Sequence, residues 1–266
     1  MPTGFRRATV PPNALYLGET SPVSSPLDQF QIKSLVQLDV AGLNLAYTNS
    51  ALWMTIAAGT AAVLLLASAN GARLVPGRLQ SVGEIMYEFI AGMIRENVGK
   101  EGKQYFPFFF TLFCFVLFGN LAGMIPGSFT FTSHIIVTFS MALAIFVVIT
   151  AIGFARHGLH FLHLFFPSGA PLATAPILIP IEVISYLARP VSLSVRLFAN
   201  MTVGHIIMKI FAGFVISLGA YFVIPGAVPF AVLVGISALE FFIAALQAYI
   251  FTILSCIYLN DAINMH

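Results

Sequence analysis

The sequence has 266 residues, of which 59% are hydrophobic and only 8% are charged, and its formal net charge at pH 7 is +2. A soluble domain carries about 25% charged residues, so this chain has too few charges to cover a water-exposed surface. The composition excludes a soluble globular protein in favour of an integral membrane protein, and the small net charge argues against a nucleic-acid partner.

The N-terminal part, residues 1–45, is predicted to be an extended segment ahead of a single transmembrane domain at 46–266. Four prolines between residues 11 and 26 favour an extended or loosely ordered backbone. The basic pair Arg6 and Arg7 is not followed by an apolar run, so a secretory signal peptide is not expected here.

The first membrane span is predicted at residues 51–69, an uncharged run of 19 residues that can cross a ~30 Å hydrocarbon core as a helix. Residues 82–99 place four charged side chains among apolar ones at helical spacing, which predicts an amphipathic helix. That helix would lie at the membrane surface or pack on a neighbouring subunit. Two further spans are predicted at 106–125 and 134–154, joined as a helical hairpin by the short connection 126–133.

The connection after this hairpin carries His157, His160 and His163. Three histidines could bind a metal, but histidines beside aromatic side chains at a membrane interface are the commoner arrangement. We therefore expect neither a metal site nor a cofactor. The two cysteines, Cys114 and Cys256, lie in apolar runs and are predicted to be small packing residues.

The C-terminal part contains two apolar segments that are too long to cross a bilayer directly. Residues 172–224 would extend ~80 Å as one straight helix, so this segment must break or tilt. We expect prolines to break its first part and to leave an unbroken helix at 191–219. These prolines are Pro176, Pro180 and Pro190.

Pro225 and Pro229 are then predicted to make the turn into a last helix at 230–259, which is ~45 Å long. Because both helices exceed the bilayer core, both should be strongly tilted. The predicted fold is therefore all-α: one roughly vertical N-terminal span, an amphipathic surface helix, a helical hairpin and two long tilted antiparallel helices.

Lysine and arginine are distributed unevenly between the two sides of this topology. Six lie after the first or third span, and three lie before the first span. The positive-inside rule then puts the N-terminus outside and the C-terminus inside, which requires five spans. No internal repeat is visible, which weakens a transporter built from inverted halves. The six are Arg73, Arg78, Arg95, Lys100, Lys103 and Arg156, and the three are Arg6, Arg7 and Lys33.

Five ionisable residues lie within the last two apolar segments, namely Glu182, Arg189, Arg196, Lys209 and Glu240. A charge at the bilayer centre costs at least ~2.5–3.5 kcal/mol on insertion scales. Glu182 and Lys209 could lie near an interface and serve either structure or function. Arg196 and Glu240 have apolar sequence far on both sides, so a functional role is expected for both.

A single antiparallel register aligns the polar residues of these two helices. Facing positions in such a pair have residue numbers with a roughly constant sum, here between 440 and 445. The aligned pairs are Arg196–Gln247, His205–Glu240 and Glu182–Tyr258. The result is a polar seam through the membrane. A hydrogen-bond network that only holds the helices together is the alternative, but neutral side chains would do that at lower cost than an arginine.

Four segments resemble the a subunit of the membrane (Fo) sector of F-type ATP synthases. The most specific are RPVSLSVRLFANMTVGH at 189–205 and LQAYIFTILSCIYLNDA at 246–262. FGNLAGMIP at 118–126 and SPLDQF at 25–30 agree with the same family. The resemblance implies a stator proton channel beside a ring of c subunits, held by b-type subunits of the peripheral stalk in the lipid bilayer. It also implies a non-catalytic chain, and no phosphate-binding loop occurs in the sequence.

The resemblance further implies a role in proton translocation for seven residues. Arg196 matches the family's essential arginine, Gln247 its partner, and Asn200 a position in the motif core. His205 and Glu240 match the entry half-channel. The exit half-channel is matched by Glu182 and Tyr258.

A secondary transporter and a structural membrane anchor of a larger complex are the alternative functions. For the location, a bacterial inner membrane is favoured over a mitochondrial one, because no clear transit peptide is present.

Overall fold

The computed structural model describes residues 31–40, 43–70, 73–125, 127–165, 174–220 and 223–264. Expectations for residues 1–30, including the SPLDQF motif, lie outside this part of the chain. Within it, five helices are long and apolar enough to cross a membrane, which confirms the all-α integral membrane class. They are Asn49–Ala69, Gly99–Gly123, Ile135–Leu162, Ala175–Gly219 and Gly226–Ile263.

A short β-hairpin precedes the first span, a feature that the sequence analysis did not anticipate. Strand β1 (Ser34–Val40) pairs antiparallel with β2 (Leu43–Thr48). Thr48 then caps helix α1 (Asn49–Ala69), because its side chain accepts a hydrogen bond from the backbone N–H of Ala51. Such a cap satisfies one of the unpaired N–H groups at a helix start.

The predicted amphipathic helix forms. The two spans of the predicted hairpin are joined by a short connection, but they pack on other helices rather than on each other. Helix α2 (Arg78–Asn97) and the 3₁₀ helix η2 (Gly99–Tyr105) lead into α3 (Phe106–Gly123). A second 3₁₀ helix, η3 (Phe131–Ser133), connects α3 to α4 (Ile135–His157). The 3₁₀ helix η4 (Gly158–Phe165) follows α4.

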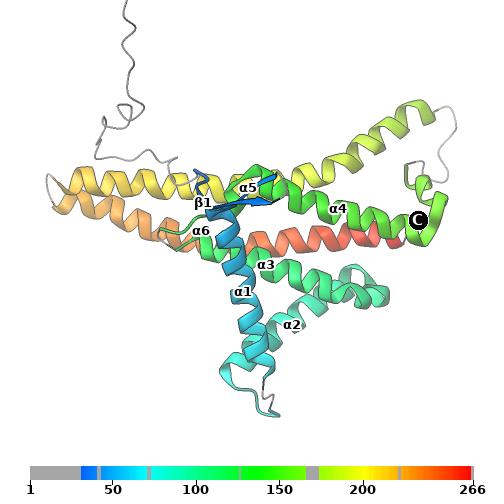
Figure 1. Ribbon diagram of the computed structural model, residues 1–266, viewed down its shortest axis with the longest axis horizontal. Helices are drawn as coiled ribbons and strands as arrows, with labels where there is room; N and C mark the ends of the chain where they lie inside the picture. Colours follow the sequence, from blue (N-terminus) through cyan, green and yellow to red (C-terminus); the bar gives the residue numbers. More distant parts are fainter. Residues whose placement is uncertain are drawn as a thin grey trace, which may run out of the picture.

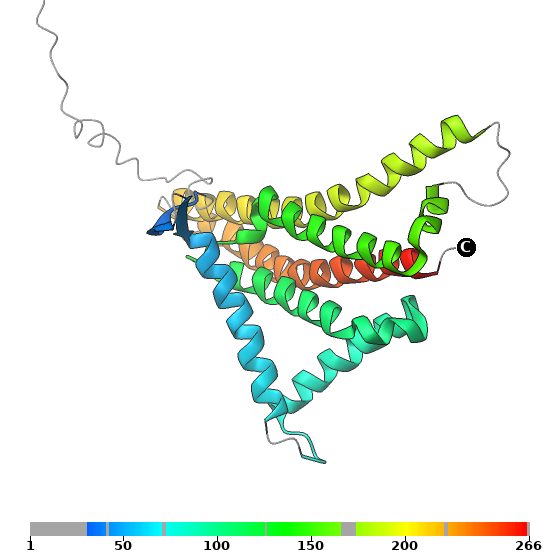
Figure 2. The same cartoon turned by 45° about the vertical axis from the view of Figure 1, so that its right-hand side comes forward.

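Helix α5 (Ala175–Gly219) is continuous for 45 residues, so the predicted breaks at proline are wrong. Pro176 lies in the first turn, where an N–H has no helical partner, and Pro180 and Pro190 lie inside the helix. The first part of α5 bends away from its neighbour (Figures 1 and 2). Prolines inside membrane helices commonly kink the helix without ending it.

Helix α6 (Val223–Ile263) begins earlier than predicted. Pro225 and Pro229 both belong to this helix. Pro225 lies in the first turn, where its missing N–H costs no helical hydrogen bond. The prediction that these two prolines make the turn between the long helices is therefore wrong.

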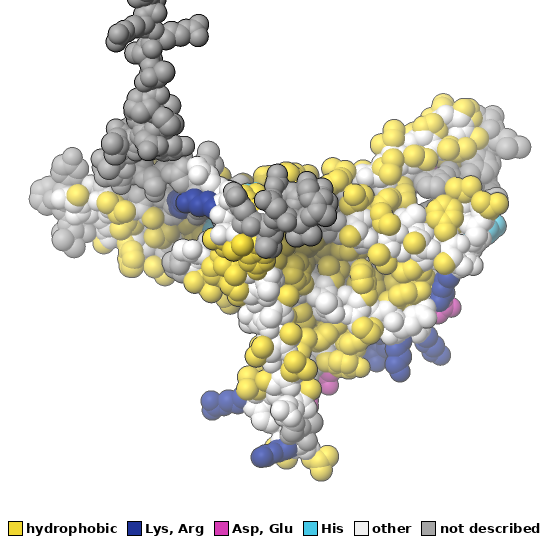
Figure 3. All heavy atoms as spheres, viewed as in Figure 1, with side chains coloured by type: hydrophobic (Ala, Val, Ile, Leu, Met, Phe, Trp, Pro, Cys, Tyr) yellow, Lys and Arg dark blue, Asp and Glu magenta, His cyan; other side chains and the backbone are white. Residues whose placement is uncertain are grey.

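Helices α5 and α6 run side by side and antiparallel, and α1 crosses their direction steeply in both views (Figures 1 and 2). Helix α4 packs on α5 and α3 packs on α6. The core between them is built from fully buried side chains such as Val116, Leu197, Met201 and Phe251. Large hydrophobic side chains also cover much of the outer surface (Figure 3), as expected for a protein solvated by lipid.

Candidate functional site

The polar face of α5 lies at the edge of its contact with α6. Leu193, Leu197 and Met201 recur every four residues and are fully buried against the bundle. Ser192, Arg196 and Asn200 recur at the same interval on the neighbouring face and are exposed. The spacing puts each set on one side of the helix, so the arginine faces away from the hydrophobic core of this chain.

Arg196 lies close to the middle of the 45-residue helix α5. Within the described part of the chain, its guanidinium forms no hydrogen bond or ion pair that the structure records. Its neighbours on the exposed surface include Val195 and Val203, which are 43% and 53% exposed. A permanent cation that faces lipid without a counter-charge is costly.

Asn200 and Gln247 join the two long helices at this level. The Asn200 amide Nδ2 donates a hydrogen bond of 2.8 Å to Oε1 of Gln247. Gln247 is 1% exposed, and its Nε2 has no partner among the described residues. The residue numbers of this pair add to 447, so the predicted register is correct to within one helical turn. Asn200, rather than Arg196, is the residue opposite Gln247.

His205 and Glu240 lie further along the same contact and are 7% and 3% exposed. The Glu240 carboxyl group packs against the backbone of Gly204, where a Cβ atom would lie 2.5 Å from Cδ of Glu240. Neither carboxyl oxygen has a hydrogen-bond partner among the described residues. Glu240 therefore lies against the residue that precedes His205 on α5, and the structure records no hydrogen bond between the Glu240 and His205 side chains.

The imidazole of His205 is bonded instead by the α3–α4 connection. Its Nε2 lies 3.0 Å from Oγ1 of Thr130, and this hydroxyl also donates to the carbonyl of Gly123 at 3.2 Å. Thr202 fastens the same loop to α5 through a hydrogen bond of 3.2 Å to the carbonyl of Ser133. Sequence reasoning missed Thr130, and the only signal was a run of hydroxyl residues in the connection.

Asn120, from the FGNLAGMIP motif, supports the Glu240 side of the site from α3. Its side chain is fully buried, and Nδ2 donates a 3.2 Å hydrogen bond to the carbonyl of Ala244, one turn after Glu240. The Asn120 Oδ1 atom has no partner within the described residues. Buried polar atoms in this state are rare in folded proteins and commonly indicate a function or a bound water.

A second polar cluster lies toward the other end of α5 and α6. Nη1 of Arg189 lies 3.0 Å from Oδ2 of Asp261, which makes an ion pair, although the geometry does not meet that of a hydrogen bond. The guanidinium also lies over the rings of Tyr258 and Tyr186, at 4.9 and 5.2 Å from their centroids. Both contacts fall within the range of a cation–π interaction.

Arg189 is therefore the residue opposite Tyr258, and the predicted alignment of Glu182 with Tyr258 is not observed. Glu182 is half-buried and lies two turns, or ~10 Å, before Arg189 on α5. The bend of α5 carries this first part away from α6 (Figure 2). Sequence reasoning did not single out Asp261, which lies in the motif at 246–262.

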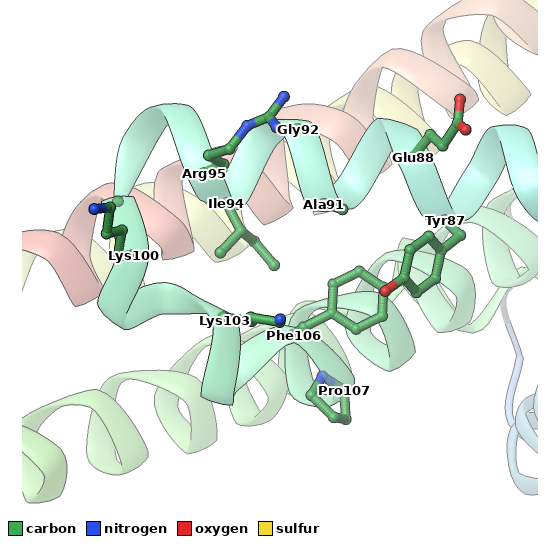
Figure 4. A pocket seen from close by; sticks show the side chains of 11 residues that line it. Tyr87, Glu88, Ala91, Gly92, Ile94, Arg95, Lys100, Lys103, Phe106 and Pro107 are labelled. Carbon is green, nitrogen blue, oxygen red and sulfur yellow. The ribbon is translucent and has the colours of Figure 1, made fainter.

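A separate cleft of about 890 Å³ lies between α2, η2 and the start of α3. None of the residues that line it belongs to α5 or α6. Figure 4 shows Lys103 and the rings of Tyr87 and Phe106 between α2 and α3, while the Arg95 and Lys100 side chains extend away from these rings. The cleft is therefore distinct from the polar contact between the two long helices.

Comparisons with known proteins agree over nearly the whole chain. A family model described as ATP synthase A chain matches residues 51–260. ATP synthase subunit a of Rhodospirillum rubrum is 63% identical over 242 residues, which cover 91% of this chain and 99% of the relative. The protein of that name from Paramagnetospirillum magneticum is 62% identical over 247 residues, covering 92% and 100%. That of Parvibaculum lavamentivorans is 47% identical over 242 residues, covering 90% and 93%.

Proposed function

The chain belongs to the ATP synthase A chain family, and on that premise we propose that it is the stator proton channel of a rotary F-type ATP synthase. In this role it supplies two half-channels and a mid-membrane arginine, which together couple proton flow to rotation of a c-ring and to ATP synthesis. The chain itself is not an enzyme in this proposal, because the chemistry on ATP takes place on other subunits.

The observation that carries the proposal is the outward-facing Arg196 near the middle of α5. An arginine on a lipid-facing surface is too costly to retain as a structural feature. A carboxylate on a neighbouring rotor would neutralise it. The exposed face that contains Ser192, Arg196 and Asn200 is therefore the surface that we assign to the c-ring.

Arginine suits this position because its guanidinium is not deprotonated in proteins. It cannot relay a proton, so it interrupts any water chain that would join the two membrane faces. Its positive charge favours the ionised form of a carboxylate that approaches it. A rotor carboxyl group that arrives protonated would thus release its proton near Arg196. Movement of one charge across 100 mV supplies ~2.3 kcal/mol, which a leak past the arginine would waste.

The two polar clusters on either side of Arg196 supply the half-channels. His205 and Glu240 form the entry side, since both side chains are buried and both exchange protons near neutral pH when their surroundings allow it. Glu182 and Tyr258 belong to the exit side. The contact of Arg189 with Tyr258 adds a second fixed cation there.

The remaining assignments concern the assembly and the membrane. The b-type subunits of a peripheral stalk would hold this chain against the c-ring. The chain would lie in a bacterial inner membrane, with the N-terminus outside and the C-terminus on the cytoplasmic side. The lysine and arginine side chains gather mostly around α2 and the neighbouring helix ends (Figure 3), which supports this orientation through the positive-inside rule.

The test uses inverted membrane vesicles that contain the assembled complex. Arg196→Ala and Arg196→Lys should both abolish ATP-driven acidification while the complex still assembles, because a buried lysine can lose its proton. Arg73→Lys, a change at a cation outside the long helices, is the matched control and should pump normally. Acidification at the normal rate by the Arg196→Lys variant would overturn the proposal.

A further inference from the structure

The connection between α3 and α4 is buried to an extent that is unusual for a loop. Residues 129–133 are all buried, and Phe131 and Thr132 are fully enclosed. Connecting segments normally run over the surface, because their backbone groups need water. Here the loop lies on α5 instead, where Thr202 donates a hydrogen bond to the Ser133 carbonyl.

Thr130 occupies the point where this loop meets the proposed entry site. Its Oγ1 lies 3.0 Å from Nε2 of His205 and 3.2 Å from the carbonyl oxygen of Gly123, to which it donates. A Cβ atom on residue 123 would lie 2.6 Å from that hydroxyl, so only glycine leaves room for Thr130 there. The hydroxyl is thus held from both sides.

The hydrogen bonds of the Thr130 hydroxyl determine which ring nitrogen of His205 is available to exchange a proton. A threonine hydroxyl has one proton to donate and can accept others. Because Thr130 donates to Gly123, it can accept a hydrogen bond from Nε2–H of His205 in both the neutral and the protonated state of the ring. Within the described residues, Nδ1 has no hydrogen-bond partner on record. Nδ1 is then the atom that gains and loses the proton.

We propose that Thr130 is a positioning residue for proton entry, which holds Nε2 of His205 in the protonated form and leaves Nδ1 as the exchanging atom. This inference rests on the proposed function of His205. A water molecule on the entry side donates a proton to Nδ1, and a second water molecule on the rotor side later accepts that proton from Nδ1, while the Nε2–H bond to Thr130 stays in place. No ring flip and no change of tautomer is needed during a cycle.

The test compares three substitutions in the assembled complex. Thr130→Val removes the hydroxyl at nearly constant volume, and Thr130→Ser retains it. Thr132→Val is the matched control, because Thr132 is fully buried in the same loop and its hydroxyl has no partner among the described residues. Passive proton conductance of the membrane sector is measured as a function of pH, and ¹⁵N magnetic resonance reports the tautomer of His205.

We expect Thr130→Val to lower conductance at least about tenfold, to shift its pH profile and to mix the two His205 tautomers. Thr130→Ser and Thr132→Val should retain the wild-type profile and tautomer. A wild-type pH profile and tautomer in Thr130→Val would overturn the inference. A failure of the proposed role of His205 in proton entry can be told apart from a failure of this inference. In the first case, His205→Ala would also conduct protons at the normal rate.

The cleft between α2 and α3 carries a second and independent inference. Arg95, Lys100 and Lys103 surround it, against the single acidic residue Glu88. The structure records no ion pair for any of these three cations within the described part of the chain. The tilted contact of Tyr87 with Phe106, with ring centroids 4.6 Å apart, forms an apolar wall.

We also infer that this cleft binds the phosphate headgroup of an anionic phospholipid. Three cations against one carboxylate leave a net positive charge, which complements the negative charge of a phosphodiester. Figure 4 shows Lys103 directed inward beside the rings of Tyr87 and Phe106. The lysine would contact the headgroup, and the aromatic rings would contact the acyl chain. Helix α2 is amphipathic and leads to the apolar start of α3, so the cleft lies where the headgroup and acyl regions of a leaflet would meet.

The assembled complex is placed in nanodiscs that contain phosphatidylcholine and phosphatidylglycerol, and the retained lipids are counted by mass spectrometry. A variant with Arg95→Gln, Lys100→Gln and Lys103→Gln should lose about one phosphatidylglycerol per complex. The matched control, Arg73→Gln with Arg78→Gln, should retain it, and added inorganic phosphate should not displace it. The inference would be overturned if all variants retained the lipid equally or if the control lost it as the triple variant does. Displacement of the lipid by phosphate, or loss of a partner subunit from the triple variant, would overturn it as well.

Discussion

Replacing Gly204 with alanine should slow proton transfer without unfolding the protein. A Cβ atom on residue 204 would lie 2.5 Å from Cδ and 3.2 Å from Cγ of Glu240. Non-bonded carbon atoms prefer about 3.5–4.0 Å, so the Glu240 carboxyl group must move by about 1 Å or the two helices must separate. Gly204 thus sets how closely α5 approaches the proposed proton-carrying group.

The two consequences of this substitution differ in size. Overpacking a tight contact costs about 1–3 kcal/mol, while alanine favours a helix over glycine by about 1 kcal/mol. The net loss of stability should therefore be no more than about 2 kcal/mol. A displacement of 1 Å at a reacting group can reduce a rate about a hundredfold, so proton conductance should fall much more than stability does.

The assay is passive proton conductance of the membrane sector, measured together with the thermal midpoint of the solubilised complex. Gly213→Ala is the matched control, because it lies on the same helix and a Cβ there meets no atom within 4 Å. Combining Gly204→Ala with Glu240→Asp shortens the displaced side chain and should restore part of the flow. Conductance of Gly204→Ala equal to that of Gly213→Ala would refute the reasoning.

Two further predictions follow from the polar clusters on α5 and α6. His205→Ala and Glu240→Ala should each lower conductance at least about tenfold, while the exchange His205→Glu with Glu240→His should retain appreciable flow; near-normal conductance in both single variants would show that protons enter elsewhere. Arg189→Gln should lower the thermal midpoint of the complex, because Asp261 loses its ion pair at a cost of about 1–3 kcal/mol. The reversed pair, Arg189→Asp with Asp261→Arg, should recover part of that loss, and an unchanged midpoint in the single variant would contradict the role assigned to this contact.

Several features could be predicted from the sequence because they depend on local chemistry. Apolar runs of helical length predicted the five spans, since a backbone in lipid must satisfy its own hydrogen bonds. The spacing of polar residues predicted the antiparallel register of α5 and α6 to within one turn at Gln247, but it was wrong by two turns at Tyr258. The cost of intramembrane charge singled out Arg196 and Glu240, and the structure places them on the two helices of the same contact.

Other features depended on packing between segments that are distant in the chain. Asn200 faces Gln247, and Arg189 faces Tyr258, and neither pairing could be derived from the spacing of polar residues along the two helices. Thr130 reaches His205 across 75 residues of sequence because the α3–α4 loop folds inward onto α5. Periodicity determines which face of a helix a residue occupies, but only tertiary packing determines which other segment meets that face.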